Sequence, residues 1–164
     1  MEPRPSSFAL AESRRLVHPA RVRLVSRDGA CLDLRPTAYQ FEEPESVSVD
    51  GDAGDLDDWL VVNGRVRTAD RREWSFVQPC LTTREAIVLG DWLAGVGSGD
   101  VEPSPAAAPD GRLVFIEPNI SFSVETVMTT RIRLRVHLSH ESMPPWNPDH
   151  DWPDYQAYFV TLDV

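Results

Sequence analysis

Three of the four histidines lie close to carboxylates near the C-terminus, where their side chains could bind a metal ion. His137, His140 and Glu141 form one group, and the sequence Asp-His-Asp at 149–151 forms the other. Two imidazoles and one carboxylate are a ligand set for zinc or iron. On a strand, however, His137 and His140 would point to opposite faces of the sheet. The spacing therefore favours solvated polar residues at a strand end and in a loop.

A second group of chemically capable residues is the acid-rich segment between residues 42 and 58. It holds eight carboxylates and no base, and its acids are Glu42, Glu43, Glu45, Asp50, Asp52, Asp55, Asp57 and Asp58. The run from Asp50 is similar to a calcium loop, but Gly54 breaks the phase and no glutamate occupies the final ligand position. We therefore expect no dedicated calcium site, and interpret the segment as a contact surface for a basic protein.

Two tryptophans, Trp146 and Trp152, lie in the proline-rich sequence 143–153 beside further acids. Large aromatic side chains on a stiff loop make good anchors for a partner, because their burial costs little side-chain entropy. We predict that both contact the same partner as the acid-rich segment. In the alternative, the prolines fold both rings back over the sheet edge.

The motifs of common catalytic sites are missing from the sequence. It contains no Gly-x-Ser-x-Gly nucleophile turn. The glycines at 95–99 follow a predicted helix, whereas a phosphate-binding loop would open one. Cys31 and Cys80 lie far apart and outside any Cys-x-x-Cys pattern, so buried free thiols are expected. We predict a protein that is not an enzyme and that uses no cofactor and no metal ion.

The overall charge points to a protein partner. The 164 residues include 26 acids and 16 bases, all of them arginine, for a net charge of −10. Nucleic-acid binding requires a basic surface, so this balance argues against it. No apolar run is long enough for a signal peptide or a membrane span. We therefore expect a cytoplasmic protein that binds neither nucleic acid nor a membrane.

Most of the chain has the two-residue apolar period of β-strands. The period is strictest over residues 131–138, where arginines and His137 alternate with aliphatic side chains. The turn sequences Asp28-Gly29 and Asn63-Gly64 each predict a hairpin between the strands that flank them. The predicted strands lie at 22–24, 31–34, 59–62, 65–67, 74–77, 113–116, 120–124, 131–138 and 155–164.

One segment changes to a helical period. Residues 82–85 form a capping box, Thr-Thr-Arg-Glu. Behind it Ala86, Leu89, Leu93 and Val96 recur at helical spacing. Glycines 95 and 97 should end the helix, which is therefore predicted over about 83–95. The Pro/Ala/Gly-rich residues 97–111 should then form a mobile loop.

Hairpins and one amphipathic helix predict a mainly β, α+β fold, an antiparallel β-sandwich-like domain. A parallel sheet would need several crossover helices. The length fits one domain. We predict an N-terminal arm at 1–19, whose order the sequence leaves open, and a single β-rich domain at 20–164.

Five short sequences occur in a set order along the chain. They are Trp-Leu-Val-Val-Asn-Gly at 59–64, Trp-Ser-Phe-Val-Gln-Pro-Cys-Leu at 74–81, Asp-Trp-Leu at 91–93, Phe-Ile-Glu-Pro-Asn-Ile-Ser-Phe at 115–122 and Pro-Pro-Trp at 144–146. Together they resemble the WapI family of small bacterial immunity proteins, over about residues 20–164. The resemblance implies a cytoplasmic inhibitor of the toxic C-terminal domain of a secreted polymorphic toxin, often a nuclease. It carries over no binding residue.

Two other functions remain open at this point. One is a metal-dependent enzyme that uses His137, His140 and Asp149. The other is a structural module that self-associates through exposed strand edges. The sequence does not determine the oligomeric state.

Overall fold

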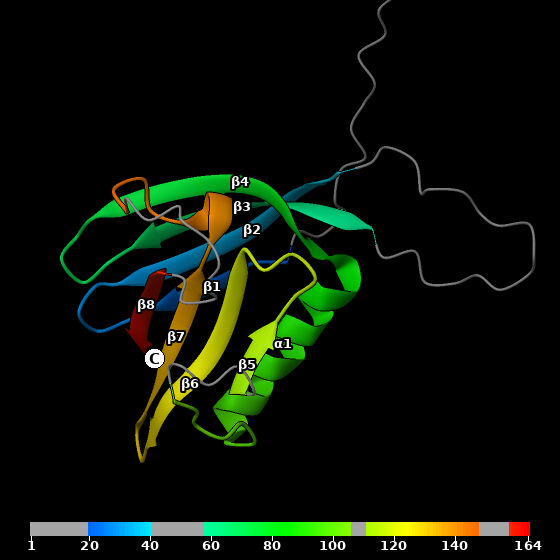
Figure 1. The fold of residues 1–164 in the computed structure, drawn as a ribbon. Coiled ribbons are helices and arrows are strands. Elements are labelled where there is room, and N and C mark those ends of the chain that lie inside the picture. Colours follow the sequence, from blue (N-terminus) through cyan, green and yellow to red (C-terminus); the bar gives the residue numbers. More distant parts are fainter. Residues whose placement is uncertain (1–19, 41–57, 106–110, 148–157) are drawn as a thin grey trace, which may run out of the picture.

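The computed structural model describes residues 20–40, 58–105, 111–147 and 158–164 (Figure 1). Within these ranges the chain forms two antiparallel four-stranded sheets and one α-helix. Sheet A contains β1 (Val22–Val25), β2 (Cys31–Tyr39), β3 (Trp59–Arg67) and β4 (Glu73–Thr82). Sheet B contains β5 (Arg112–Val114), β6 (Ile120–Met128), β7 (Arg131–Leu138) and β8 (Tyr158–Asp163). The helix α1 (Thr83–Ser98) follows β4, and a short 3₁₀ helix, η2 (His140–Ser142), follows β7.

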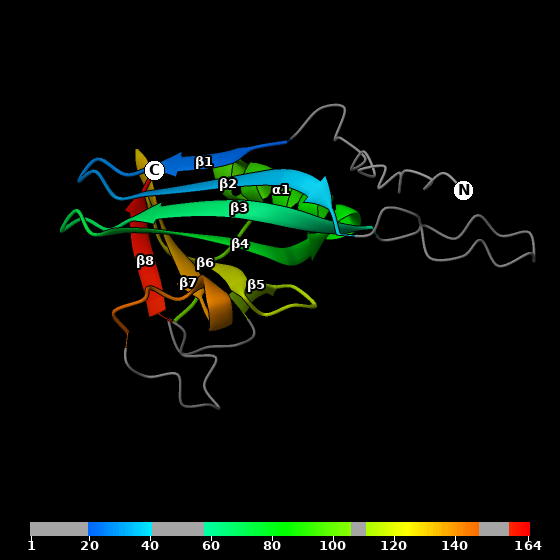
Figure 2. The same cartoon turned by 90° about the horizontal axis from the view of Figure 1, so that it is seen from above.

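Each strand pairs with its neighbour in sequence, so each sheet is a simple meander. The strands of sheet A run across those of sheet B (Figures 1 and 2), and α1 packs against β4. The predicted mainly β, α+β sandwich with one helix is confirmed.

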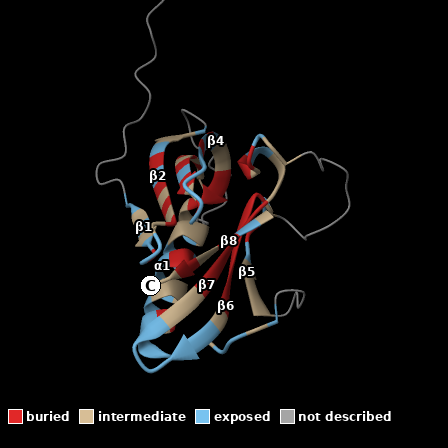
Figure 3. Cartoon of the chain, turned by 90° about the vertical axis from the view of Figure 1, so that its left-hand side faces the viewer, coloured by how far each residue is buried: buried red, intermediate tan, exposed pale blue. Residues whose placement is uncertain are grey.

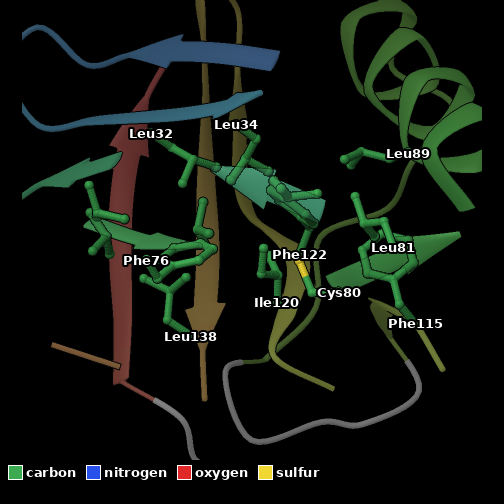
Figure 4. Close-up of a cluster of buried hydrophobic side chains, with 14 of the residues drawn as sticks. Leu32, Leu34, Phe76, Cys80, Leu81, Leu89, Phe115, Ile120, Phe122 and Leu138 are labelled. Atoms are coloured by element: carbon green, nitrogen blue, oxygen red, sulfur yellow. The ribbon is translucent and has the colours of Figure 1, made fainter. Parts of the chain in front are cut away.

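The inner faces of the two sheets share one hydrophobic core. Leu32, Leu34 and Phe76 enter it from sheet A, and Phe122 and other side chains enter it from sheet B (Figure 4). Leu89 closes the core from α1. Burial of each such side chain stabilises the fold by roughly 1.5–3 kcal/mol. The strand period therefore decides which residues face the core and which face outward.

The capping box forms as predicted, but the helix is longer. The Thr82 hydroxyl accepts the Glu85 N–H at 3.2 Å, and the Glu85 carboxylate accepts the Thr82 N–H at 2.9 Å. The predicted end at residue 95 is wrong, because α1 continues to Ser98 and Gly99 provides the left-handed C-cap with φ 83°. Val96 is buried on the core side, so the last turn packs there and stays helical. The segment predicted as a loop from residue 97 therefore starts after Ser98.

One predicted hairpin is confirmed and the other is wrong. Gly29, with φ 93°, lies in the turn between β1 and β2. In contrast, β3 runs straight through Asn63-Gly64. Gly64 lies opposite Phe76, and a Cβ there would be 2.1 Å from the end of that ring. Gly64 therefore allows the Phe76 ring to pack closely against β3 and does not form a turn. The hairpin forms later, where the Thr68 N–H donates to the Arg72 carbonyl at 2.9 Å.

Replacing Gly64→Ala should destabilise the protein by about 1–3 kcal/mol, because the new methyl group overlaps the Phe76 ring. Gly90→Ala is the matched control, since nothing lies within 4 Å of its Cβ position in α1. That change should stabilise the helix by about 0.5–1 kcal/mol. Urea unfolding of both variants measures the difference. Equal stability of the Gly64→Ala variant and the wild type would contradict this packing.

Candidate functional site

Most of the predicted acid-rich surface lies outside the described residues. This applies to Glu42, Glu43, Glu45, Asp50, Asp52, Asp55 and Asp57, and also to Trp152. Asp58 is described, is half-buried, and its carbonyl oxygen accepts the Thr83 N–H at 3.0 Å. On the other side of the segment, the Gln40 N–H donates to the Trp59 carbonyl at 2.8 Å. Both attachment points of segment 41–57 are therefore fixed at one end of sheet A, next to the start of α1 (Figure 1).

The described part of the chain is electrically balanced. Residues 20–40, 58–105, 111–147 and 158–164 contain equal numbers of acidic and basic residues. The whole net charge of −10 therefore belongs to the four remaining segments. Segment 41–57 contributes the largest share of their acids. The excess of acidic residues is therefore concentrated in a few segments of the sequence, and the described part of the chain is neutral.

Exposed apolar side chains occur at the same end of the scaffold. Ile87 in α1 is 65% exposed, and Ile116 after β5 is 69% exposed. The Glu85 carboxylate accepts the Ile116 N–H at 2.6 Å, which ties this loop to the start of the helix. Val88 is also exposed. None of these residues was predicted as a contact residue from the sequence. The available signal was that Ile87 is an apolar residue outside the apolar face of α1 that contains Leu89.

Trp146 lies at the opposite end of sheet A from Asp58. Its ring makes a T-shaped contact with Trp74, with centroids 5.2 Å apart, and Arg72 lies 5.1 Å from its centre. Trp74 pairs with Val66 on β3. At about 3.3 Å per residue, Val66 is roughly 25 Å along β3 from Asp58. The structure therefore does not bring Trp146 together with the start of the acidic segment, and the ring packs within the fold.

His137 is buried, so the prediction that it is solvent-exposed is wrong. Its side chain is 2% exposed and its Nε2 shares a 2.9 Å hydrogen bond with the Ser123 hydroxyl. Burial, reinforced by Arg112 and Arg135, lowers the pKa of His137 from 6.5 to about 4. Sequence period alone missed this because both faces of β7 are buried toward its C-terminal end (Figure 3). The ring is therefore neutral at pH 7.

The predicted metal ligands do not form a described site. His140 lies in η2 with a φ of 52°, whereas His137 lies on the outer face of sheet B. Asp149 and His150 fall outside the described residues. Within the described ranges no three His, Cys, Asp or Glu side chains are placed to hold a metal ion. Ser123 beside His137 could resemble a nucleophile and base, but Ser123 is only 1% exposed and closed to a substrate.

The two cysteines are free thiols, as predicted. Cys80 is buried, and burial together with the nearby Glu85 and Glu117 raises the pKa of its thiol to about 12. A thiol in this state is a poor nucleophile. Cys31 is half-buried rather than buried, on the outer face of sheet A.

Two antiparallel meanders packed face to face, with one helix after the first, define an α+β sandwich protein. The chain belongs to the immunity protein WapI-like family, whose sequence model matches residues 23–164. No curated protein and no solved structure matches the chain. Among the described residues, no helix has the length and apolar character needed to cross a membrane.

Trp146→Ala should lower the free energy of unfolding by about 1–2 kcal/mol, because it removes a half-buried ring that packs against Trp74. Thermal and urea unfolding measure this loss. An unchanged stability would show that the ring is not part of the packed fold.

His137 makes stability depend on pH in a defined direction. The unfolded chain takes up a proton near pH 6.5, whereas the folded ring resists protonation down to about pH 4. Stability should therefore fall as the pH drops from 6.5 to 4, by up to roughly 3 kcal/mol from this residue. In His137→Gln that part of the pH dependence should disappear. Parallel slopes for the two proteins, measured by urea unfolding at successive pH values, would contradict the assignment.

Proposed function

We propose that this protein is a cytoplasmic immunity protein that neutralises a cognate toxin domain by binding it. Membership of the immunity protein WapI-like family supports the class of function. The charge distribution supports the proposal further. The described residues are electrically balanced, and the whole net charge of −10 lies in the few remaining segments. Such a distribution suits a protein that captures a basic partner, since opposite charges speed association and help to exclude wrong partners.

The proposed contact surface is centred on the acid-rich segment from Glu42 to Asp58. Its attachment points are held at the start of α1 through Asp58 and Thr83. The exposed side chains of Ile87, Val88 and Ile116 lie at the same end. Charges at the rim of an interface mainly raise the rate of association, and buried apolar contacts mainly slow dissociation. We propose that this end of the molecule supplies both the charged rim and the apolar contacts.

The charge also suggests the kind of toxin. A nuclease needs a basic cleft to hold the phosphate backbone. Carboxylates presented on a fixed scaffold are suited to occupy that cleft and compete with nucleic acid. We therefore propose a nuclease domain as the partner, inhibited by occupancy rather than by any reaction. Trp152 remains part of the proposed surface, whereas Trp146 acts in the packing of the fold.

Reversing charge in the acid-rich segment tests this surface. The triple change Asp52→Lys, Asp55→Lys and Asp57→Lys should weaken binding of the native host's toxin domain at least tenfold at low salt. It should also flatten the salt dependence of the affinity, because fewer ion pairs form. Calorimetry or biolayer interferometry at several salt concentrations measures both effects.

The matched control reverses three exposed acids away from this end of the scaffold, Asp100, Glu102 and Glu141. It changes the net charge by the same amount and should weaken binding far less. Wild-type affinity and salt dependence in the Asp52/Asp55/Asp57 variant would exclude this segment as the contact surface.

A further inference from the structure

The outer face of sheet A carries a cluster of arginines. Arg23 on β1 and Arg65 on β3 each lie directly opposite Asp33 on β2. Arg35 lies two residues further along β2 and so points to the same side. Residues directly opposite on antiparallel strands have Cβ atoms about 4.5–5.5 Å apart. Three exposed arginines therefore share this face with one aspartate.

The Asp33 carboxylate already forms an ion pair with Arg21. The Arg21 Nε donates to Asp33 at 2.7 Å, and its second nitrogen reaches the other carboxylate oxygen. The pKa of Asp33 is lowered, first by the hydrogen bond from Arg21 and then by the positive charges around it. Further along the face, Arg67 lies 3.6 Å from Glu73. Among the described residues, Arg23, Arg35 and Arg65 have no ion pair of their own.

An excess of arginine on an exposed sheet face favours one kind of ligand. Each guanidinium offers a planar set of donors that matches a carboxylate, as the Arg21–Asp33 pair on the same face shows. The three unpaired groups repel one another, and that repulsion falls when an opposing anion arrives. A surface bearing several carboxylates would satisfy this arrangement.

We propose that this arginine face, formed by Arg23, Arg35 and Arg65, is a second contact surface for the toxin domain and takes a carboxylate-bearing part of it. The inference rests on the proposed function. β2 and β3, which carry Arg35 and Arg65, are also the strands that flank the acid-rich sequence 41–57. At about 3.3 Å per residue Arg65 lies roughly 23 Å along β3 from Asp58, a distance that one protein domain spans, so one partner can meet both signs of charge. A long polyanion would be repelled by the acids of that sequence, whereas a protein with a basic cleft and acidic flanks would match both.

The test uses the full chain and the toxin domain from the native host. Arg35→Glu with Arg65→Glu should reduce the association rate at least tenfold at low salt, with the difference shrinking at high salt. The matched control, Arg71→Glu with Arg131→Glu, makes the same charge change at exposed positions away from this face. It should have less than a threefold effect. Circular dichroism and urea unfolding confirm that both variants are folded.

The possible results separate this inference from the proposed function. If wild-type protein binds the toxin and the Arg35/Arg65 variant binds equally fast or faster, the arginine face is wrong and the proposed function stands. If both double variants lost the same fraction of the association rate, the loss would come from net charge alone, and this result would also overturn the inference. If wild-type protein does not bind the toxin at all, the proposed function fails and the inference fails with it. Retention of a single-stranded RNA by the wild type, lost in the Arg35/Arg65 variant, would assign the face to nucleic acid instead.

Discussion

The packing of Phe122 is the constraint on which the remaining structure depends. This ring is fully buried on β6, 6.0 Å from Trp92 of α1 and 6.3 Å from Phe115, so sheet B, the helix and the β5–β6 connection meet around it. Because side chains alternate along a strand, fixing one face of each sheet against this core also fixes the opposite face. The arginines around Asp33 point outward for that reason. The polar pair of Ser123 and His137 occupies the outer face of sheet B for the same reason.

Glu85 links the core to the proposed functional end of the molecule. One oxygen of its carboxylate caps α1 through the Thr82 N–H, and the other accepts the Ile116 N–H. The neighbouring Thr83 N–H donates to Asp58, where the acid-rich segment joins β3. These bonds hold the helix start, the exposed isoleucine and the attachment of the acids in a fixed arrangement. A binding protein gains affinity from such preorganisation, because less ordering remains to be done when the partner arrives.

Local sequence rules predicted the helix and the strands better than the contacts between them. Alternation located most of the strands, and the Thr82–Glu85 capping box located the helix start, because both signals act within a few residues.

The wrong predictions share one cause, which is a contact between residues far apart in the sequence. Gly64 looked like a turn residue, but it makes room for Phe76 from the next strand. His137 looked solvated because the sequence does not show that both faces of β7 become buried. Trp146 looked like a free anchor until Trp74, far away in sequence, supplied its packing surface. The arginine cluster likewise depends on strand register, which no single segment reveals.

The proposed function requires that a charge-balanced sandwich presents concentrated acids to a basic toxin domain. Affinity purification of the protein from its native host, at low and then moderate salt, with mass spectrometry of the co-eluting proteins, tests this most directly. We expect a stoichiometric basic toxin C-terminal domain that dissociates as the salt concentration rises. Recovery of the protein alone, from cells shown to express the toxin, would contradict it.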